Sequence, residues 1–227
     1  MTDFVLVHGG SHGGWCWERL VPILAADDRV GSVVAVDLSG HGSRANVKPI
    51  EQISRGDYVD DVVSDIESAN LQDVILVGHS LAGITIPLVA ARVPERMRRL
   101  VYLSTSNPVP GQSLSQLMEH PLSPFSLGAD FKEMFCNDLD AASREWLLSR
   151  LENEPPGPMD EPMPEVKLAD SIASTYILLE QDQALVPQFQ REQAVNAGVD
   201  EVVTLDAGHS AFVSRPAELA GLLLAYA

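Results

Sequence analysis

Short apolar segments that suit buried strands recur along the chain and alternate with longer amphipathic segments. Most of the apolar segments are continuous rather than alternating, which is typical of parallel strands covered by helices on both faces. The strands predicted from this pattern are 4–8, 32–37, 73–78, 98–104, 174–179 and 201–205.

The segments between these strands predict helices near 15–26, 54–69, 80–92, 188–197 and 216–226. Segment 54–69 shows the helical period clearly, because its apolar positions fall on one face and its acidic positions on the other. The apolar face holds Val59, Val62, Val63 and Ile66, opposite Asp60, Asp61, Asp65 and Glu67. The repeated strand–helix pattern predicts an α/β fold, a doubly wound sheet of about six parallel strands.

Residues 106–170 interrupt this alternation of strands and helices, because they contain no clear strand and are dense in proline. A structureless loop of that length is improbable, so we expect a small, mainly helical lid inserted into a core formed by 1–105 and 171–227. One lid helix is predicted over 140–154, begun by Asp140. Such an insertion lies above the carboxyl ends of the strands, where α/β sheets bind ligands.

Length and charge narrow the class of protein. The 227 residues suit one α/β domain, and 15 Lys and Arg against 32 Asp and Glu give a formal net charge of −17. That charge repels phosphate backbones, so no nucleic acid partner is expected. No apolar run approaches the roughly 18 residues of a membrane helix and no signal-peptide pattern is present, so we expect a cytoplasmic protein with no membrane partner. Cys16 and Cys136 are far apart and are expected to stay reduced.

Ser80 lies in "VILVGHSLAG", where an apolar strand runs into a glycine-rich turn and a helix. This resembles G-x-S-x-G, the sharp turn that exposes a nucleophilic serine, although Ala82 stands at the last glycine position and Gly83 follows one residue late. The alternative is a serine that only caps the helix. The motif by itself leaves both interpretations open.

A serine nucleophile needs a base and a carboxylate that orients the base. His209 follows the last strand in "DAGHSAF", and Asp182 follows the strand before it. Glu180 and Asp206 are rival carboxylates, but Asp206 is too near His209 in the sequence to approach it from a different loop, and we favour Asp182. The resulting chain order, Ser80, Asp182, His209, is the order that this fold uses. Four other histidines in glycine-rich turns, and one in the lid, are interpreted as local hydrogen-bonding or surface residues. They are His8, His12, His41, His79 and His120.

The turn "LVHGGSHGGWCW" after the first strand is expected to supply a second backbone donor. We predict an oxyanion hole from the N–H groups of Gly10 and Leu81. The alternative of a phosphate-binding loop is disfavoured, because neither G-x-x-x-x-G-K-[ST] nor a suitably placed G-x-G-x-x-G occurs. No metal-ligand spacing is present, so no metal is expected.

Together these stretches, with "VVAVDLSGHG" and "ILLEQDQALVPQFQ", resemble α/β-hydrolases of the plant methylesterase and hydroxynitrile lyase group, in its bacterial branch. The resemblance covers nearly the whole chain. It implies a triad of Ser80, His209 and Asp182, no cofactor, and is compatible with a homodimer. The lyases of the group carry a threonine and a lysine where this chain has Gly9 and Ser210, so the esterase side is favoured.

We therefore expect a serine hydrolase acting on a small carboxylic ester with an apolar or aromatic group. Side chains expected to line its pocket are Met118, Leu122, Phe125, Phe131, Trp146 and Phe212. The alternatives left open are a lyase or another non-hydrolytic use of the triad, a lactonase or thioesterase, and a ligand-binding receptor on a hydrolase scaffold.

Overall fold

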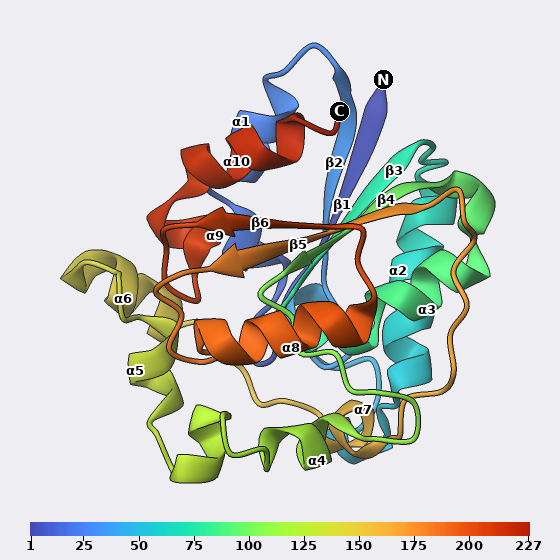
Figure 1. Ribbon diagram of the computed structural model, residues 1–227. Helices are drawn as coiled ribbons and strands as arrows, with labels where there is room; N and C mark the ends of the chain where they lie inside the picture. Colours follow the sequence, from blue (N-terminus) through green and yellow to red (C-terminus); the bar gives the residue numbers. More distant parts are fainter.

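A six-stranded parallel sheet in the order β2-β1-β3-β4-β5-β6 forms the centre of the computed structural model, which describes residues 1–227 (Figure 1). The strand β2 pairs with β1 on one side, and β3 to β6 follow on the other side. This reversal of direction confirms the predicted doubly wound sheet. The strands are β1 Thr2–Val7, β2 Val30–Val36, β3 Val74–His79, β4 Met97–Leu103, β5 Ala173–Leu179 and β6 Glu201–Leu205.

Helices cover both faces of the sheet (Figure 1). On one face α1 packs beside α10, and Leu24 and Leu223 join a buried cluster with Trp17. On the other face α2 packs against α3, and Val62 and Val89 belong to a second cluster that also takes in α8. These helices are α1 Val21–Ala25, α2 Arg55–Ser68, α3 Ile86–Arg92, α8 Pro187–Ala197, α9 Ala211–Ser214 and α10 Pro216–Leu224. No helix has the length and apolar character needed to cross a membrane.

Two predicted helices are broken into shorter pieces. Segment 15–26 forms η1 and then α1, and segment 80–92 forms η4 and then α3. Pro22 and Pro87 occupy the first turns of α1 and α3. Proline has no N–H and is tolerated only in a first turn, so each helix has to begin anew just before it. The 3-10 helices are η1 Gly14–Trp17, η2 Gly42–Arg44, η3 Ile50–Gln52, η4 Ser80–Ile84, η5 Pro94–Arg96 and η6 Pro124–Leu127.

Residues 106–170 form short helices that gather at the carboxyl-terminal end of the strands (Figure 1). In addition to η6 they are α4 Leu114–Met118, α5 Phe131–Phe135, α6 Ala141–Leu148 and α7 Pro156–Asp160. Asp140 caps α6 by accepting from the Ser143 N–H at 2.7 Å, as the sequence indicates.

The predicted helix over 140–154 is too long, because α6 ends at Leu148. The following residues run back over the core as an extended strap. The Glu152 N–H donates to the Ser11 carbonyl at 2.9 Å, and its carboxylate accepts from the Gly42 N–H at 2.7 Å. These contacts with the turns after β1 and β2 replace the hydrogen bonds that a longer helix would make.

Candidate active site

Ser80 is the first residue of η4, directly after β3, and has a strained backbone φ of 52°. Positive φ is uncommon for a residue other than glycine and marks a conformation that the surrounding structure imposes. In a nucleophile elbow this strain lifts the serine hydroxyl above the end of the sheet. Ser80 lines a cavity at that end.

The glycines around Ser80 are explained by close packing. A Cβ at Gly83 would collide with the carbonyl oxygen of Ser106, and a Cβ at Gly78 would lie 2.8 Å from Ile86. The same Cβ at Gly78 would lie 3.1 Å from the methyl of Ala82. The late glycine is therefore required at position 83, and the Ala82 methyl is accommodated because Gly78 has no side chain.

The structure brings Ser80, His209 and Asp182 into one hydrogen-bonded chain. His209 Nε2 lies 3.1 Å from Ser80 Oγ, and His209 Nδ1 lies 2.7 Å from Asp182 Oδ2. Since a carboxylate only accepts, Nδ1 carries the hydrogen and Nε2 is free to accept from the serine hydroxyl. The rival carboxylates Glu180 and Asp206 are exposed and do not contact His209.

Asp182 is buried and fully engaged. Its Oδ1 accepts from the backbone N–H groups of Ala184 and Leu185 at 2.7 and 2.9 Å, and its Oδ2 also accepts from the Ser104 hydroxyl at 2.6 Å. Burial and the nearby Asp182 charge raise the pKa of the Tyr176 hydroxyl. The three hydrogen bonds from Ala184, Leu185 and Ser104 hold the Asp182 carboxylate in one orientation toward His209. No sequence pattern points to Ser104, because only the fold brings the end of β4 beside Asp182.

His8 and His12 hold the turn that contains Gly10. His8 Nδ1 donates to the Gly9 carbonyl at 2.8 Å, and His12 Nδ1 donates to the Gly10 carbonyl at 2.7 Å. Burial lowers the pKa of His8 to about 3 and that of His12 to about 4, so both rings are neutral near pH 7. In a trans peptide the N–H points away from the preceding C=O, so fixing the Gly9 carbonyl also fixes the Gly10 N–H.

Gly10 and Leu81 lie side by side at the cavity wall with Ser80. A Cβ built on Gly10 would stand 3.3 Å from Leu81 Cδ1, and both residues line the cavity. The two residues predicted to supply backbone donors therefore lie together at the cavity wall that Ser80 also lines. An oxyanion hole needs two such backbone donors that converge on one point.

His79 contacts His209 through its ring and through a hydrogen bond. Its ring lies 4.5 Å from the His209 ring, and its Nε2–H donates to the His209 carbonyl at 3.0 Å. Burial and the proximity of His209 lower the pKa of His79 well below its usual range. His79 therefore stays neutral and positions the His209 backbone without adding charge.

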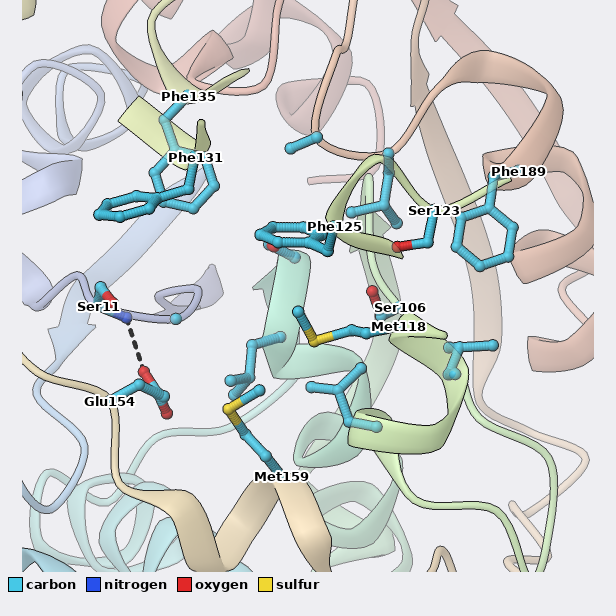
Figure 2. A pocket seen from close by; sticks show the side chains of 17 residues that line it. Ser11, Ser106, Met118, Ser123, Phe125, Phe131, Phe135, Glu154, Met159 and Phe189 are labelled. Carbon is cyan, nitrogen blue, oxygen red and sulfur yellow. Dashed lines mark hydrogen bonds between the residues drawn. The ribbon is translucent and has the colours of Figure 1, made fainter. Parts of the chain in front are cut away.

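The cavity above Ser80 has a volume of about 220 Å³ and a mainly apolar wall (Figure 2). Of the six predicted lining residues, Met118, Phe125 and Phe131 do line it. The other lining residues are Gly10, Ser11, Ser80, Leu81, Ser106, Leu114, Leu117, Ser123, Phe135, Glu154, Met159, Ala184, Leu185 and Phe189.

The remaining three predicted lining residues lie elsewhere. Phe212 is fully buried under the turn and packs on Trp17, and Trp146 packs edge-on against Trp15 at 5.4 Å. Leu122 packs against the buried cluster that contains Val62 and Val89. Apolar character near the site does not distinguish a cavity wall from a packed interior.

No group of three or more His, Cys, Asp or Glu side chains is arranged to hold a metal ion. Cys16 and Cys136 are buried and free, as expected from their separation in the sequence.

Residues 4–222 match the alpha/beta hydrolase family. The chain is 30% identical to methylesterase 9 of Arabidopsis thaliana, over 99% of this chain and 97% of the relative. It is 41% identical to a carbendazim-hydrolysing esterase of a Nocardioides species, over 55% of this chain and half of the relative. The crystal structure of a pyrethroid hydrolase from Sphingobium faniae superposes with a TM-score of 0.82 at 25% identity, covering 99% of this chain and 96% of that one.

This chain belongs to the alpha/beta hydrolase family. The resemblance to the methylesterase group, and with it the prediction of a carboxylic ester hydrolase of this superfamily, is confirmed.

Proposed function

We propose that this protein hydrolyses small, largely apolar carboxylic esters through an acyl-enzyme formed on Ser80. The observation that carries the proposal is the hydrogen-bonded chain from Ser80 through His209 to Asp182, which opens into an apolar cavity. Serine is a weak nucleophile on its own and needs such a base to become reactive.

In the first half-reaction, Ser80 Oγ attacks the ester carbonyl carbon and His209 Nε2 accepts the hydroxyl proton. Asp182 stabilises the resulting imidazolium without taking up a proton itself. The carbonyl oxygen becomes negative and accepts from the N–H groups of Gly10 and Leu81. The tetrahedral intermediate then collapses, the C–O bond to the alcohol breaks, and His209 protonates the departing alcohol.

In the second half-reaction, a water molecule attacks the acyl-Ser80 carbonyl while His209 accepts one of its protons. The same two N–H groups stabilise the second tetrahedral intermediate. Collapse breaks the bond to Ser80 Oγ, which recovers its proton from His209. The carboxylic acid leaves and the enzyme returns to its starting state.

The cavity supports a small substrate with an apolar group. An apolar protein cavity of about 150 Å³ is large enough to hold one benzene molecule. The 220 Å³ here therefore fits a single ring or a short alkyl chain beside the ester. The wall is contributed by the core, by α8 and by the lid.

Residues 106–170 act in this proposal as the lid that excludes water from the reacting ester. Support comes from contacts between α5, the segment after it and the His209 loop. The Ser210 hydroxyl donates to the Phe135 carbonyl at 2.8 Å, and Asp138 accepts from the Gly208 N–H at 2.7 Å. A lid fastened on both sides of His209 keeps that loop in place.

Cyanohydrin cleavage is the less favoured reaction, because a departing cyanide needs a nearby cation. The cavity wall contains no Lys or Arg, and its one charged side chain is acidic. Ser210 is buried with its hydroxyl directed at the Phe135 carbonyl. Lactones and thioesters need only the same acyl-transfer steps and are tested with the esters.

The test is a turnover panel of methyl, short-chain alkyl and aryl esters, lactones, thioesters and mandelonitrile, with Ser80→Ala as the matched control. We expect hydrolysis of esters and a loss of about 10⁴-fold or more in kcat/KM for Ser80→Ala. Cleavage of mandelonitrile without ester hydrolysis would show that the protein is a lyase and not an esterase. Undiminished ester turnover by Ser80→Ala would refute the mechanism.

A further inference from the structure

Glu154 is the only charged side chain in the cavity wall. It lies on the strap between α6 and α7, and its side chain is 14% exposed. Figure 2 shows Glu154 beside Ser11 on one side of the cavity, with Ser123 and Phe189 on the opposite side. An acidic group is thus built into a mainly apolar pocket that Ser80 also lines.

Three contacts hold the Glu154 carboxylate in place. Oε2 accepts from the Ser11 N–H at 2.6 Å and lies 3.2 Å from His41 Nε2, and Oε1 accepts from the Tyr58 hydroxyl at 2.8 Å. Ser11 itself adopts a φ of 61°, a backbone conformation that directs its N–H at the carboxylate. Burial and the Glu154 charge raise the pKa of Tyr58, so its hydroxyl remains a donor.

These partners do not saturate the carboxylate. A carboxylate offers about four lone-pair positions, and two donors with one nearby ring nitrogen leave at least one for a ligand. Glu154 is one of the residues that line the cavity. A Cβ on Gly10 would stand 3.4 Å from Glu154 Oε2, so the charge borders the donor that receives the oxyanion.

We propose that Glu154 sets the substrate class of this site: it selects esters that carry an ammonium or N–H donor close to the reacting carbonyl, and rejects esters that carry a second carboxylate. A substrate donor hydrogen-bonds to the carboxylate and offsets its charge beside the developing oxyanion. A substrate anion faces both Glu154 and the oxyanion in a cavity of low polarity. This inference rests on the proposed ester hydrolysis by Ser80.

Three methyl esters with the same two-methylene spacer between the ester and the terminal group test the selectivity. Methyl butanoate is neutral, methyl β-alaninate ends in an ammonium group, and monomethyl succinate ends in a carboxylate. We expect the kcat/KM of the wild type to fall in the order methyl β-alaninate, methyl butanoate, monomethyl succinate. Glu154→Gln keeps the shape and removes the charge, so the ratio of monomethyl succinate to methyl butanoate rises about tenfold or more.

Tyr58→Phe is the matched control, because it removes one hydrogen bond to Glu154 and leaves the charge in place. We expect this variant to keep the order of the three esters. A second measurement needs no change at Glu154: in 1 M salt the Debye length falls to about 3 Å, which screens the net charge of −17 but not a contact inside the cavity. The wild type should therefore keep its order in high salt.

The inference is overturned if the wild type in high salt has equal kcat/KM values for monomethyl succinate and methyl butanoate. It is also overturned if Glu154→Gln leaves the ratio of these two values unchanged. Both results leave the esterase proposal intact as long as methyl butanoate is hydrolysed. If the wild type hydrolyses no ester at all, the proposed function fails and this inference fails with it.

Discussion

The imidazole of His8 holds the carbonyl oxygen of Gly9 at 2.8 Å, and this contact sets the direction of the Gly10 N–H across the same peptide. His8 is itself fixed from the other side, since its Nε2 accepts from the Leu38 N–H at 3.1 Å. A neutral ring thus links the turn after β1 to the turn after β2. It acts on the proposed oxyanion hole without touching the substrate.

His8→Ala should lower kcat for a model ester about 10²-fold with a smaller change in KM, because a misaligned donor is lost mainly in the transition state. His8→Asn places an amide N–H close to the position of Nδ1, so it should recover part of the loss. Steady-state kinetics of the three proteins decide. Wild-type kcat in His8→Ala, or equal losses in both variants, would show that the ring has only a packing role.

Gly83→Ala should destabilise the fold by about 1–3 kcal/mol, because its Cβ collides with the Ser106 carbonyl oxygen. Gly221→Ala is the matched control. It lies in α10 with no atom within 4 Å of a new Cβ, and should raise stability by about 0.5–1 kcal/mol. Urea unfolding of both variants measures the difference. A Gly83→Ala protein as stable as the wild type would contradict the packing explanation for the late glycine.

Asp182→Asn should lower kcat about 10⁴-fold while leaving the fold intact, because an amide can donate to His209 and favour the wrong tautomer. Ser104→Ala removes only the hydroxyl that orients Asp182, and should cost about tenfold. Ester kinetics with a thermal unfolding control test both values. Loss of activity in Ser104→Ala equal to that in Asp182→Asn would mean that the hydroxyl does more than orient the carboxylate.

The free energy of unfolding should decrease as the pH falls below about 6.5. His8 and His12 have their pKa values lowered to about 3 and about 4, mainly by burial, whereas in the unfolded chain both titrate near 6.5. The unfolded state therefore binds more protons between these values, and the free energy of unfolding decreases as the pH falls. Each ring contributes about 1.4 kcal/mol per pH unit in this window.

Urea unfolding between pH 4 and 7 measures this slope, and His12→Asn is the informative variant. Asparagine can still donate to the Gly10 carbonyl but does not titrate, so the slope should decrease by about 1.4 kcal/mol per pH unit. An unchanged slope would show that the folded protein accommodates a charged His12.

The fold was predictable from the sequence because its signals are local. Continuous apolar runs give parallel strands, and catalytic residues of this fold stand just after strand ends, which identified Ser80, Asp182 and His209 as candidates. The cavity wall was less predictable, because the direction of a lid side chain depends on distant partners. Trp146 turns away to pack on Trp15, while Phe189 reaches the cavity from α8.

Glu154 shows the same limit most clearly. A helix predicted to run to residue 154 would present it as one more acidic surface position. The end of α6 at Leu148 instead returns the chain over the core and directs the carboxylate at Ser11 and Tyr58. The strap is held by contacts with residues more than 90 positions away in the sequence. No local pattern encodes such pairings.

The most direct test of the central claim is labelling with a serine-reactive fluorophosphonate, followed by mass spectrometry of the peptide that contains Ser80. We expect one adduct per chain at Ser80 and parallel loss of ester turnover, with no labelling of Ser80→Ala. An unlabelled Ser80 in a protein that still hydrolyses the ester, or an adduct at another serine, would contradict the assignment of Ser80 as the nucleophile.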